Sequence, residues 1–193
     1  MASSPSLLRT HSLARAQREL RREITQFFCG EVLAAHAQGC AFSKAMVMTP
    51  CEKEFPIVVT TNSGYPLDLN LYQTAKGMSA AALIVRQGGT IIVASECSEG
   101  IPSQSAFERL LQSVEGPEKL LHVLRDASEP LADQWQAHIQ ANCQQRARVL
   151  LYSSMSDEKV RSAHLIPCHD IAREIRSWNR ISRRASFRPG CSS

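Results

Sequence analysis

Residues 56–77 decide the fold, and they read PIVVTTNSGYPLDLNLYQTAKG. The segment Ile57–Thr61 is β-branched throughout and mostly apolar on both faces, which is typical of a buried strand in a parallel sheet. The turn residues Asn62–Pro66 end this strand, and a mostly helical stretch begins at Leu67, with an interruption expected near Gly77. A buried strand, a turn and a helix in this order predict one β–α unit of an α/β protein.

The same alternation continues on both sides of this stretch. A further helical segment, Ala80–Arg86, is expected to end at Gly88-Gly89 before a second buried strand at Thr90–Ala94. Hydrophobic periodicity predicts other helices at 31–46, 103–113, 117–125, 133–147 and 170–178, and other strands at 149–152 and 165–166. We therefore expect an α/β layered fold with a mainly parallel sheet flanked by helices. Ligands bind at the carboxyl ends of strands in such folds, which here are the loops Thr60–Tyr65 and Ala94–Ile101.

Composition and charge limit the class of protein and the kinds of partner that we expect. The chain has 193 residues and 44% hydrophobic content, which suits one core, and we expect a single domain at 25–175. The net charge of +4 reflects arginine-rich ends, a leader at 1–24 and a tail at 176–193, both expected to be disordered. Residues 1–18 have the composition of a transit peptide, but their amphipathic pattern is weak, which favours an unstructured leader. Because the charge lies on the ends and no apolar run approaches the ~20 residues that span a bilayer, we expect neither a nucleic-acid nor a membrane partner.

The cysteines indicate reduced thiols rather than a site. There are seven, an odd number, with wide spacings and no C-x-x-C pair. Zinc sites usually bring two ligands close in sequence, and disulfide scaffolds are shorter and denser in cysteine. Cys168 and His169 are adjacent, but neighbouring residues of a strand point to opposite faces, so this pair is not favoured as a site. We expect a cytoplasmic protein without a metal-binding residue.

One pair of residues in the helical stretch suits a small anionic ligand. Gln73 and Lys76 lie three apart on one helix and share a face, where they offer an amide and a positive charge. Such a pair is most often a solvated helix face, so its spacing alone is weak support. In the turn before it, Asn62 and Gly64 tolerate a positive φ, and Pro66 fixes its own φ. Asp68 and Asn70 add short polar side chains that can lock the turn. Gly77, directly after the pair, would allow another backbone to approach closely.

The residues around this pair resemble a known family. Residues 60–81, TTNSGYPLDLNLYQTAKGMSAA, closely resemble the signature of the C-terminal domain of nickel-dependent lactate racemases and their relatives. Residues 133–136, DQWQ, resemble a later segment of that domain that contributes a tryptophan. Residues 30–42 resemble the helix just upstream of the domain, so the resemblance covers about residues 28–175.

The resemblance implies an isomerase chemistry and three substrate-binding residues. In this family a nickel-pincer nucleotide, derived from nicotinic acid, accepts a hydride from the α-carbon of a 2-hydroxy acid, while two histidines act as acid and base. Gln73 and Lys76 match the pair that contacts the substrate, and Trp135 matches the tryptophan that walls the reaction site. By this resemblance Lys76 would pair with the carboxylate of the substrate, and Gln73 would fix its orientation.

The remaining parts of the family's machinery are not expected in this chain. The catalytic histidines, the nickel ligand, the cofactor-tethering lysine and the phosphate-binding loops belong to the N-terminal domain of the family, and none of the six histidines lies in a matching motif. We therefore expect the substrate-binding half of a lactate or other 2-hydroxyacid racemase or epimerase, truncated and inactive alone, with no bound cofactor of its own. Its partners would be a small 2-hydroxy acid such as lactate and a separate N-terminal racemase domain. The alternative is a non-catalytic module that binds a small carboxylate and has lost the metal-binding domain.

Overall fold

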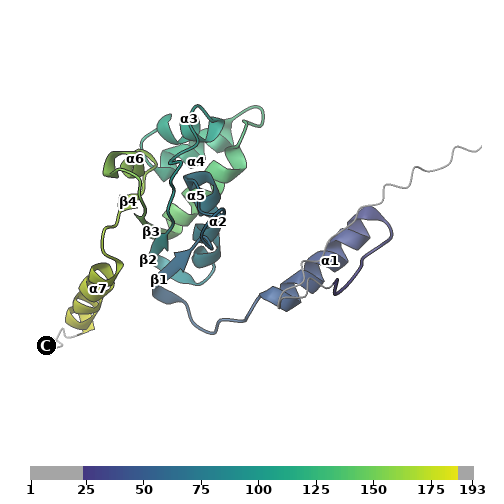
Figure 1. The fold of residues 1–193 in the computed structure, drawn as a ribbon, viewed down its shortest axis with the longest axis horizontal. Coiled ribbons are helices and arrows are strands. Elements are labelled where there is room, and N and C mark those ends of the chain that lie inside the picture. The colour runs from purple at the N-terminus through teal and green to yellow at the C-terminus, as the bar shows by residue number, and fades with distance from the viewer. Residues whose placement is uncertain (1–23, 187–193) are drawn as a thin grey trace, which may run out of the picture. The chain divides into compact units, whose positions relative to one another are not determined.

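The computed structural model describes residues 24–186, with side chains as far as Trp178. The chain divides into two units, Met1–Glu52 and Lys53–Ser193 (Figure 1). In the first unit, helix α1 spans Val32–Val47, close to the predicted range. The Glu31 carboxylate caps it by accepting a 3.0 Å hydrogen bond from the amide of Ala34. The α/β fold lies in the second unit.

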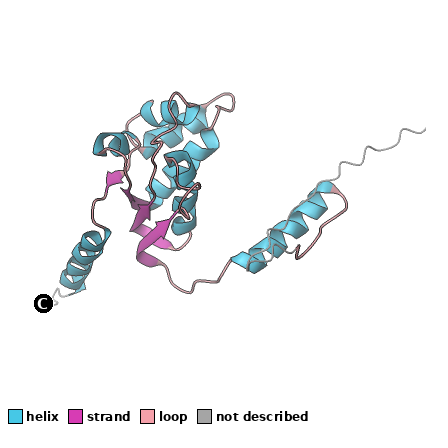
Figure 2. Ribbon diagram, viewed as in Figure 1, coloured by secondary structure: helices cyan, strands magenta, loops and turns pink. Residues whose placement is uncertain are grey.

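The second unit contains a four-stranded parallel sheet in the order β1-β2-β3-β4 (Figures 1 and 2). The strands are β1 (Phe55–Thr61), β2 (Val85–Ala94), β3 (Ala147–Tyr152) and β4 (Ile166–Pro167). The helices of this unit are α2 (Leu71–Ala82), α3 (Ala106–Gln112), α4 (Pro117–Asp126), α5 (Gln134–Arg146), α6 (Asp157–Ser162) and α7 (Ile171–Ser186). Every pair of neighbouring strands is joined through at least one helix, so the predicted α/β fold with a parallel sheet is confirmed.

The two faces of the sheet are covered to different extents. Because consecutive strands are added in one direction, right-handed crossovers keep α2 and α5 on one face. The main core lies there and includes Met78, Ile91, Val93, Phe107, Val149 and Leu151. On the opposite face a small cluster of Ile92, Leu150 and Cys168 packs with Ile57 and with Ile171 and Ile175 of α7. Val59 and Tyr152, whose positions alternate with the main-core positions, remain 46% exposed on that second face.

The boundary between α2 and β2 differs from the prediction. α2 is one unbroken helix that ends at Ala82, and the segment after it, expected to be helical to Arg86, enters β2 at Val85. Gly88-Gly89, expected to end a helix, lies inside the strand. The reason is the pairing with β1: a Cβ at Gly89 would come within 2.9 Å of the Pro56 carbonyl oxygen, so only glycine fits this contact.

Two other elements differ from the prediction. α6 was not predicted; it is short, and Ser156 caps it by accepting a 3.4 Å hydrogen bond from the amide of Lys159. α7 continues to Ser186, so part of the tail that was predicted to be disordered from residue 176 is helical. The predicted leader up to residue 23 and the last residues, 187–193, lie outside the described part of the chain. None of the helices in residues 24–186 is long and apolar enough to cross a membrane.

Helix α2 approaches the end of β1 very closely at Gly77. A Cβ added there would lie 2.8 Å from the carbonyl oxygen of Thr61 and 3.4 Å from Oδ1 of Asn62. Cβ atoms do not approach backbone oxygens so closely, and a backbone oxygen cannot swing aside as a side chain can. The sequence-based expectation that Gly77 admits another backbone is therefore confirmed, and the neighbouring backbone is the end of β1.

We predict that Gly77→Ala destabilises the protein. Alanine would favour the helix by about 1 kcal/mol, but overpacking against a rigid neighbour typically costs about 1–3 kcal/mol, and here it pushes α2 off β1. We expect a net loss in the free energy of unfolding, measured by urea denaturation. Lys76→Ala, on the exposed side of the same turn, should change this quantity by no more than about 0.5 kcal/mol. A Gly77→Ala protein as stable as the wild type would contradict the contact.

Candidate functional site

The turn between β1 and α2 is braced by its own polar groups. Asn62 is buried, and its side-chain amide donates a hydrogen bond to the carbonyl of Leu67. Ser63 and Gly64 adopt left-handed backbone angles, with φ of 65° and 73°. Asn62, which was expected to tolerate a positive φ, is not one of these residues; instead its side chain spans the turn, because a buried amide needs a partner. The turn is therefore a fixed support for the start of α2.

Two short polar side chains then tie the start of α2 to the loop after β2. The carboxylate of Asp68 accepts a 3.3 Å hydrogen bond from the amide of Glu96. Asn70 caps the helix: its Oδ1 accepts from the amide of Gln73 at 3.2 Å, and its Nδ2 donates to the carboxylate of Glu99 at 3.0 Å. The prediction that Asp68 and Asn70 lock this turn is confirmed.

A buried polar cluster makes a second connection between α2 and β2. The hydroxyl of Thr74 lies 2.6 Å from the Ser95 hydroxyl and 3.3 Å from the sulfur of Cys97. All three side chains are buried. Burial raises the pKa of the Cys97 thiol above its ordinary value, so this cysteine remains a thiol near neutral pH and is a poor nucleophile. The cluster thus holds α2 in place at Thr74, the residue directly after Gln73.

Gln73 and Lys76 meet on the outer side of α2. The ammonium group of Lys76 donates a 2.7 Å hydrogen bond to the Oε1 atom of Gln73. An ammonium has three donors, so two remain, and the Gln73 side chain also presents its NH₂ group. This arrangement of donors around one positive charge suits a carboxylate with a neighbouring oxygen. The predicted pair is therefore brought together by the structure.

Trp135 is connected to this pair through an aromatic contact that the sequence analysis missed. Its indole is 51% exposed and meets the ring of Tyr72 edge to face, with 5.6 Å between the centroids. The Tyr72 hydroxyl donates to Asp133 at 3.5 Å, and the buried amide of Gln136 donates to the Tyr72 carbonyl. Tyr72 lies four residues before Lys76 in α2, so these two side chains share a face of the helix. The sequence offered one sign of this contact, the position of Tyr72 directly before Gln73 in the predicted helix.

The three predicted substrate-binding side chains are accessible to solvent to different extents. Lys76 and Trp135 are exposed, and Gln73 is half-buried. An exposed ion pair contributes about 0.2–1 kcal/mol, whereas a dissociation constant of about 1 mM requires about 4 kcal/mol of binding free energy. The three side chains by themselves are therefore too weak a site for a small carboxylate. The same contacts become stronger where a second surface excludes water.

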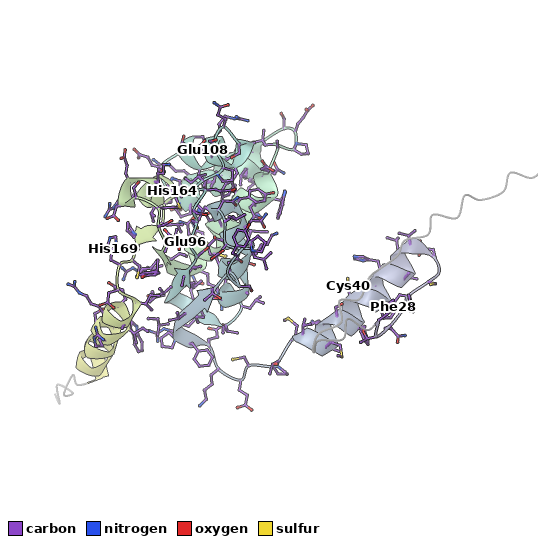
Figure 3. The ribbon with its side chains drawn as sticks, viewed as in Figure 1. Phe28, Cys40, Glu96, Glu108, His164 and His169 are labelled. Atoms are coloured by element: carbon purple, nitrogen blue, oxygen red, sulfur yellow. The ribbon has the colours of Figure 1, made fainter. Side chains whose placement is uncertain are left out.

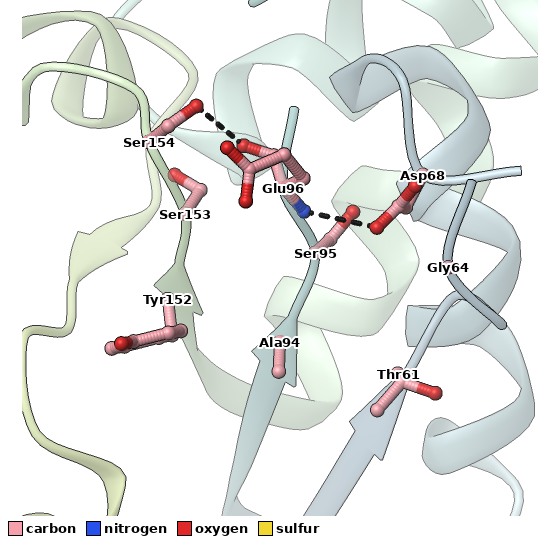
Figure 4. Close-up of a pocket in the computed structure, with 9 residues that line it drawn as sticks. All are labelled: Thr61, Gly64, Asp68, Ala94, Ser95, Glu96, Tyr152, Ser153 and Ser154. Carbon is pink, nitrogen blue, oxygen red and sulfur yellow. Dashed lines mark hydrogen bonds between the residues drawn. The ribbon is translucent and has the colours of Figure 1, made fainter. Parts of the chain in front are cut away.

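A separate crevice lies at the carboxyl ends of the strands, where the two loops were expected to form a site (Figure 4). Its volume is about 510 Å³. It is lined by Thr61, Gly64, Asp68, Ala94, Ser95, Glu96, Tyr152, Ser153 and Ser154. Neither Gln73 nor Lys76 is among these residues. The structure therefore separates two features that the sequence analysis had joined, the strand-end loops and the Gln–Lys pair.

The histidines and cysteines of the described residues do not form a metal centre. His164 is half-buried, its Nε2 lies 3.0 Å from the carbonyl oxygen of Val114, and burial lowers its pKa (Figure 3). His169 is exposed and lies 3.0 Å from the carboxylate of Asp157, whereas its neighbour Cys168 is buried. In the described part of the chain, no three His, Cys, Asp or Glu side chains lie close enough to hold a metal ion. The donor set of these residues therefore does not fit nickel.

Comparisons with known proteins identify close similarity over most of the chain. Residues 51–186 match the family model described as the lactate racemase C-terminal domain. The chain is 33% identical over 157 residues to the lactate racemase of Thermoanaerobacterium thermosaccharolyticum, covering 80% of this chain and 36% of that protein. It is also 33% identical over 138 residues to the lactate racemase of Lactiplantibacillus plantarum, covering 70% of this chain and 32% of that protein.

A solved structure agrees with this similarity. The lactate racemase apoprotein from Thermoanaerobacterium thermosaccharolyticum superposes with a TM-score of 0.70 at 32% sequence identity, over 80% of this chain and 37% of that chain. The chain thus spans about a third of the length of the relatives it matches.

The hydrogen bond between Tyr72 and Asp133 can be tested by titration. Burial, and to a smaller extent the charge and hydrogen bond of Asp133, raise the pKa of Tyr72 above its ordinary value of about 10. In a Tyr65→Phe/Tyr152→Phe background, where Tyr72 is the only tyrosine, we expect its ultraviolet titration to be shifted upward. Asp133→Asn should lower the pKa, though not fully, because burial remains.

The raised pKa of Tyr72 also determines in which direction the stability of the protein changes with pH. Tyr72 ionises at lower pH in the unfolded chain than in the folded one, so its contribution is complete below about pH 10 and is lost as pH rises further. Asp126→Asn, which removes a carboxylate from the exposed end of α4, is the matched control and should leave the titration of Tyr72 unchanged. A Tyr72 that titrates at the ordinary value would contradict the contact.

Proposed function

The chain belongs to the family of the lactate racemase C-terminal domain, and on that premise we propose that it is the substrate-binding half of a 2-hydroxyacid racemase or epimerase. In this proposal lactate or a similar acid binds to Gln73, Lys76 and Trp135, and the catalytic histidines and the nickel-pincer nucleotide are supplied by a separate N-terminal half. The observation that carries the proposal is the Lys76–Gln73 hydrogen bond of 2.7 Å, which orients the donors of both side chains on the outer face of α2.

Each of the three side chains has a distinct part in the proposed binding. The two free donors of the Lys76 ammonium pair with the carboxylate of the substrate, which neutralises its charge. The NH₂ group of Gln73 donates to a second oxygen and so fixes the rotation of the acid about its carboxylate. Trp135, held by the ring of Tyr72, covers one side of the bound acid and excludes water from it.

The proposal assigns proton and hydride transfer to the other half. In the family the nickel-pincer nucleotide supplies a hydride acceptor for the α-carbon, and the described residues of this chain have no donor set for that metal. We therefore assign no step to nickel here and infer that the chain alone does not racemise. We also propose the cytoplasm as its compartment, because Cys97, Cys143 and Cys168 are buried as thiols.

The weakness of an open site favours a half-enzyme over an independent binding module. With Lys76 exposed and Gln73 only half-buried, the pair provides too little free energy to bind a small acid at millimolar concentration without a second wall. Calorimetric titration of the full chain with D- and L-lactate separates the two. We expect no measurable heat of binding below about 10 mM, and saturable binding by the chain alone would instead support the carboxylate-binding module.

A reconstitution experiment tests the activity. The full chain is mixed with the N-terminal part of the lactate racemase from Thermoanaerobacterium thermosaccharolyticum, loaded with its cofactor, and the interconversion of D- and L-lactate is followed. A chimera in which residues 51–186 replace the matching domain of that relative avoids dependence on docking in trans. We expect turnover from the chimera and none from the chain alone. Turnover by the chain alone would overturn the proposal of a silent half.

Variants of the chimera test the residue roles. Lys76→Ala should lower kcat/KM at least ~100-fold, the usual effect of removing one charged donor from an enclosed site. Gln73→Ala should raise KM and lower kcat, because orientation is lost. Lys119→Ala is the matched control: this exposed lysine of α4 pairs with Glu115 at 3.4 Å, and its loss should leave both constants unchanged. An active Lys76→Ala chimera would remove this residue from the site.

A further inference from the structure

Three contacts from the start of α5 converge on one residue of α2, Tyr72. The two helices pack against each other on the same face of the sheet (Figure 1). Asp133 accepts a hydrogen bond from the Tyr72 hydroxyl at 3.5 Å, and the indole of Trp135 meets the Tyr72 ring. The side-chain amide of Gln136 donates to the Tyr72 carbonyl oxygen. Three of the four residues 133–136 are therefore used to hold the residue that directly precedes Gln73.

The contact made by Gln136 differs from the other two because it reaches a backbone atom. Its side chain is fully buried between the helices. A hydrogen bond depends steeply on distance and angle, whereas apolar packing has no preferred direction and tolerates sliding. The bond from Gln136 to the Tyr72 carbonyl therefore fixes how far α5 lies along α2.

Stability alone does not favour a glutamine at this position. The Oε1 atom of Gln136 has no hydrogen-bond partner among the described residues. A buried polar atom without a partner is unfavourable, and an apolar side chain of similar size would avoid that cost. A methionine or leucine, however, could not form a directional link to α2. The feature that glutamine adds here is a fixed register between the two helices.

The polar pair of α2, Gln73 and Lys76, is held in place without help from α5. The helix lies against the end of β1 at Gly77, and the hydroxyl of Thr74 is bonded within the buried polar cluster. Trp135 is different, because it projects from α5 and its indole is 51% exposed. Its distance from the polar pair is therefore set by the position of α5 relative to α2.

We propose that Gln136 is a positioning residue of the substrate site, which holds Trp135 at the distance from the polar pair that a bound 2-hydroxy acid requires. Gln136 is fully buried, so it acts through Trp135 and does not itself touch the acid. The inference rests on the proposed function, since it concerns the same site. A displacement of about 1 Å in an active site can lower a rate about 100-fold, so loss of this link should be visible in the kinetics.

Gln140 provides a matched control one turn further along α5. It is also fully buried, its amide donates to the carbonyl of Ala163 at 2.9 Å, and its Oε1 also lacks a partner among the described residues. Ala163 lies at the end of α6 and not in α2. Gln136→Met and Gln140→Met therefore remove the same kind of bond, but only the first removes a link to α2. We expect both to lower the midpoint of urea unfolding by similar amounts.

Proton NMR of the full chain tests the position of Trp135 without any need for activity. The ring centroids of Tyr72 and Trp135 are 5.6 Å apart, so nuclear Overhauser contacts between the two rings are expected. Gln136→Met should weaken these contacts, and Gln140→Met should leave them unchanged. Ring contacts that survive Gln136→Met at full strength would overturn the inference, whatever the chimera does.

The chimera of residues 51–186 tests the consequence for the substrate. Gln136→Met should lower kcat/KM for lactate about 10–100-fold, whereas Gln140→Met should change it by no more than about twofold. Once Trp135 has been replaced by alanine, Gln136→Met should cost no more than about twofold further, because its effect passes through the indole. If Gln136→Met does not fold, Gln136→Asn replaces it, since asparagine keeps an amide that is one methylene too short to reach Tyr72.

The outcomes separate this inference from the proposed function. Equal losses of kcat/KM in Gln136→Met and Gln140→Met would show a merely structural role and overturn the inference. A full Gln136→Met effect in the absence of the Trp135 indole would also overturn it. An unmutated chimera without turnover would count against the proposed function instead, and the ring contacts of the full chain would still decide whether Gln136 positions Trp135.

Discussion

The contact between Gly77 and the carbonyl oxygen of Thr61 is the constraint on which the rest of this domain depends. At 2.8 Å from a hypothetical Cβ, the end of β1 leaves no room for a side chain on that face of α2. The helix therefore lies against the strand along its first two turns. Lys76 and Gln73 lie in the same turns, so their positions in space follow directly from this backbone approach. Asn62, Asp68 and Asn70 then stabilise the short connection that makes the approach possible.

Two regions of opposite electrostatic character share this connection. The outer side of α2 presents the Lys76 ammonium and the Gln73 amide beside the Tyr72–Trp135 ring pair. The crevice at the strand ends presents the Asp68 and Glu96 carboxylates with Tyr152. One short segment between β1 and α2 contributes to both, because the strand and the helix that it joins lie in different layers.

The openness of the α2 face has an energetic consequence for any role in catalysis. In water a lysine–carboxylate contact contributes about 0.2–1 kcal/mol, but in an enclosed site the removal of a single hydrogen-bond donor typically costs about 3–4 kcal/mol. The difference must come from a second surface that displaces water from Gln73, Lys76 and Trp135. Under the proposed function, a separate N-terminal domain would provide a surface of that kind.

The sequence by itself determined the α/β class, the strands and every helix of the described residues except α6 at their approximate positions, because buried parallel strands and amphipathic helices leave strong local patterns. It also indicated Gln73, Lys76 and Trp135, through spacing and family resemblance. Only the tertiary structure decided the rest. The β2 pairing overrode the helical pattern after Ala82, Asn62 became a brace rather than a positive-φ residue, and Tyr72 proved to join Trp135 to the polar pair. The β2 pairing and the Tyr72–Trp135 contact depend on residues distant in sequence, which no local pattern records, and the Asn62 brace depends on how the turn folds back on itself.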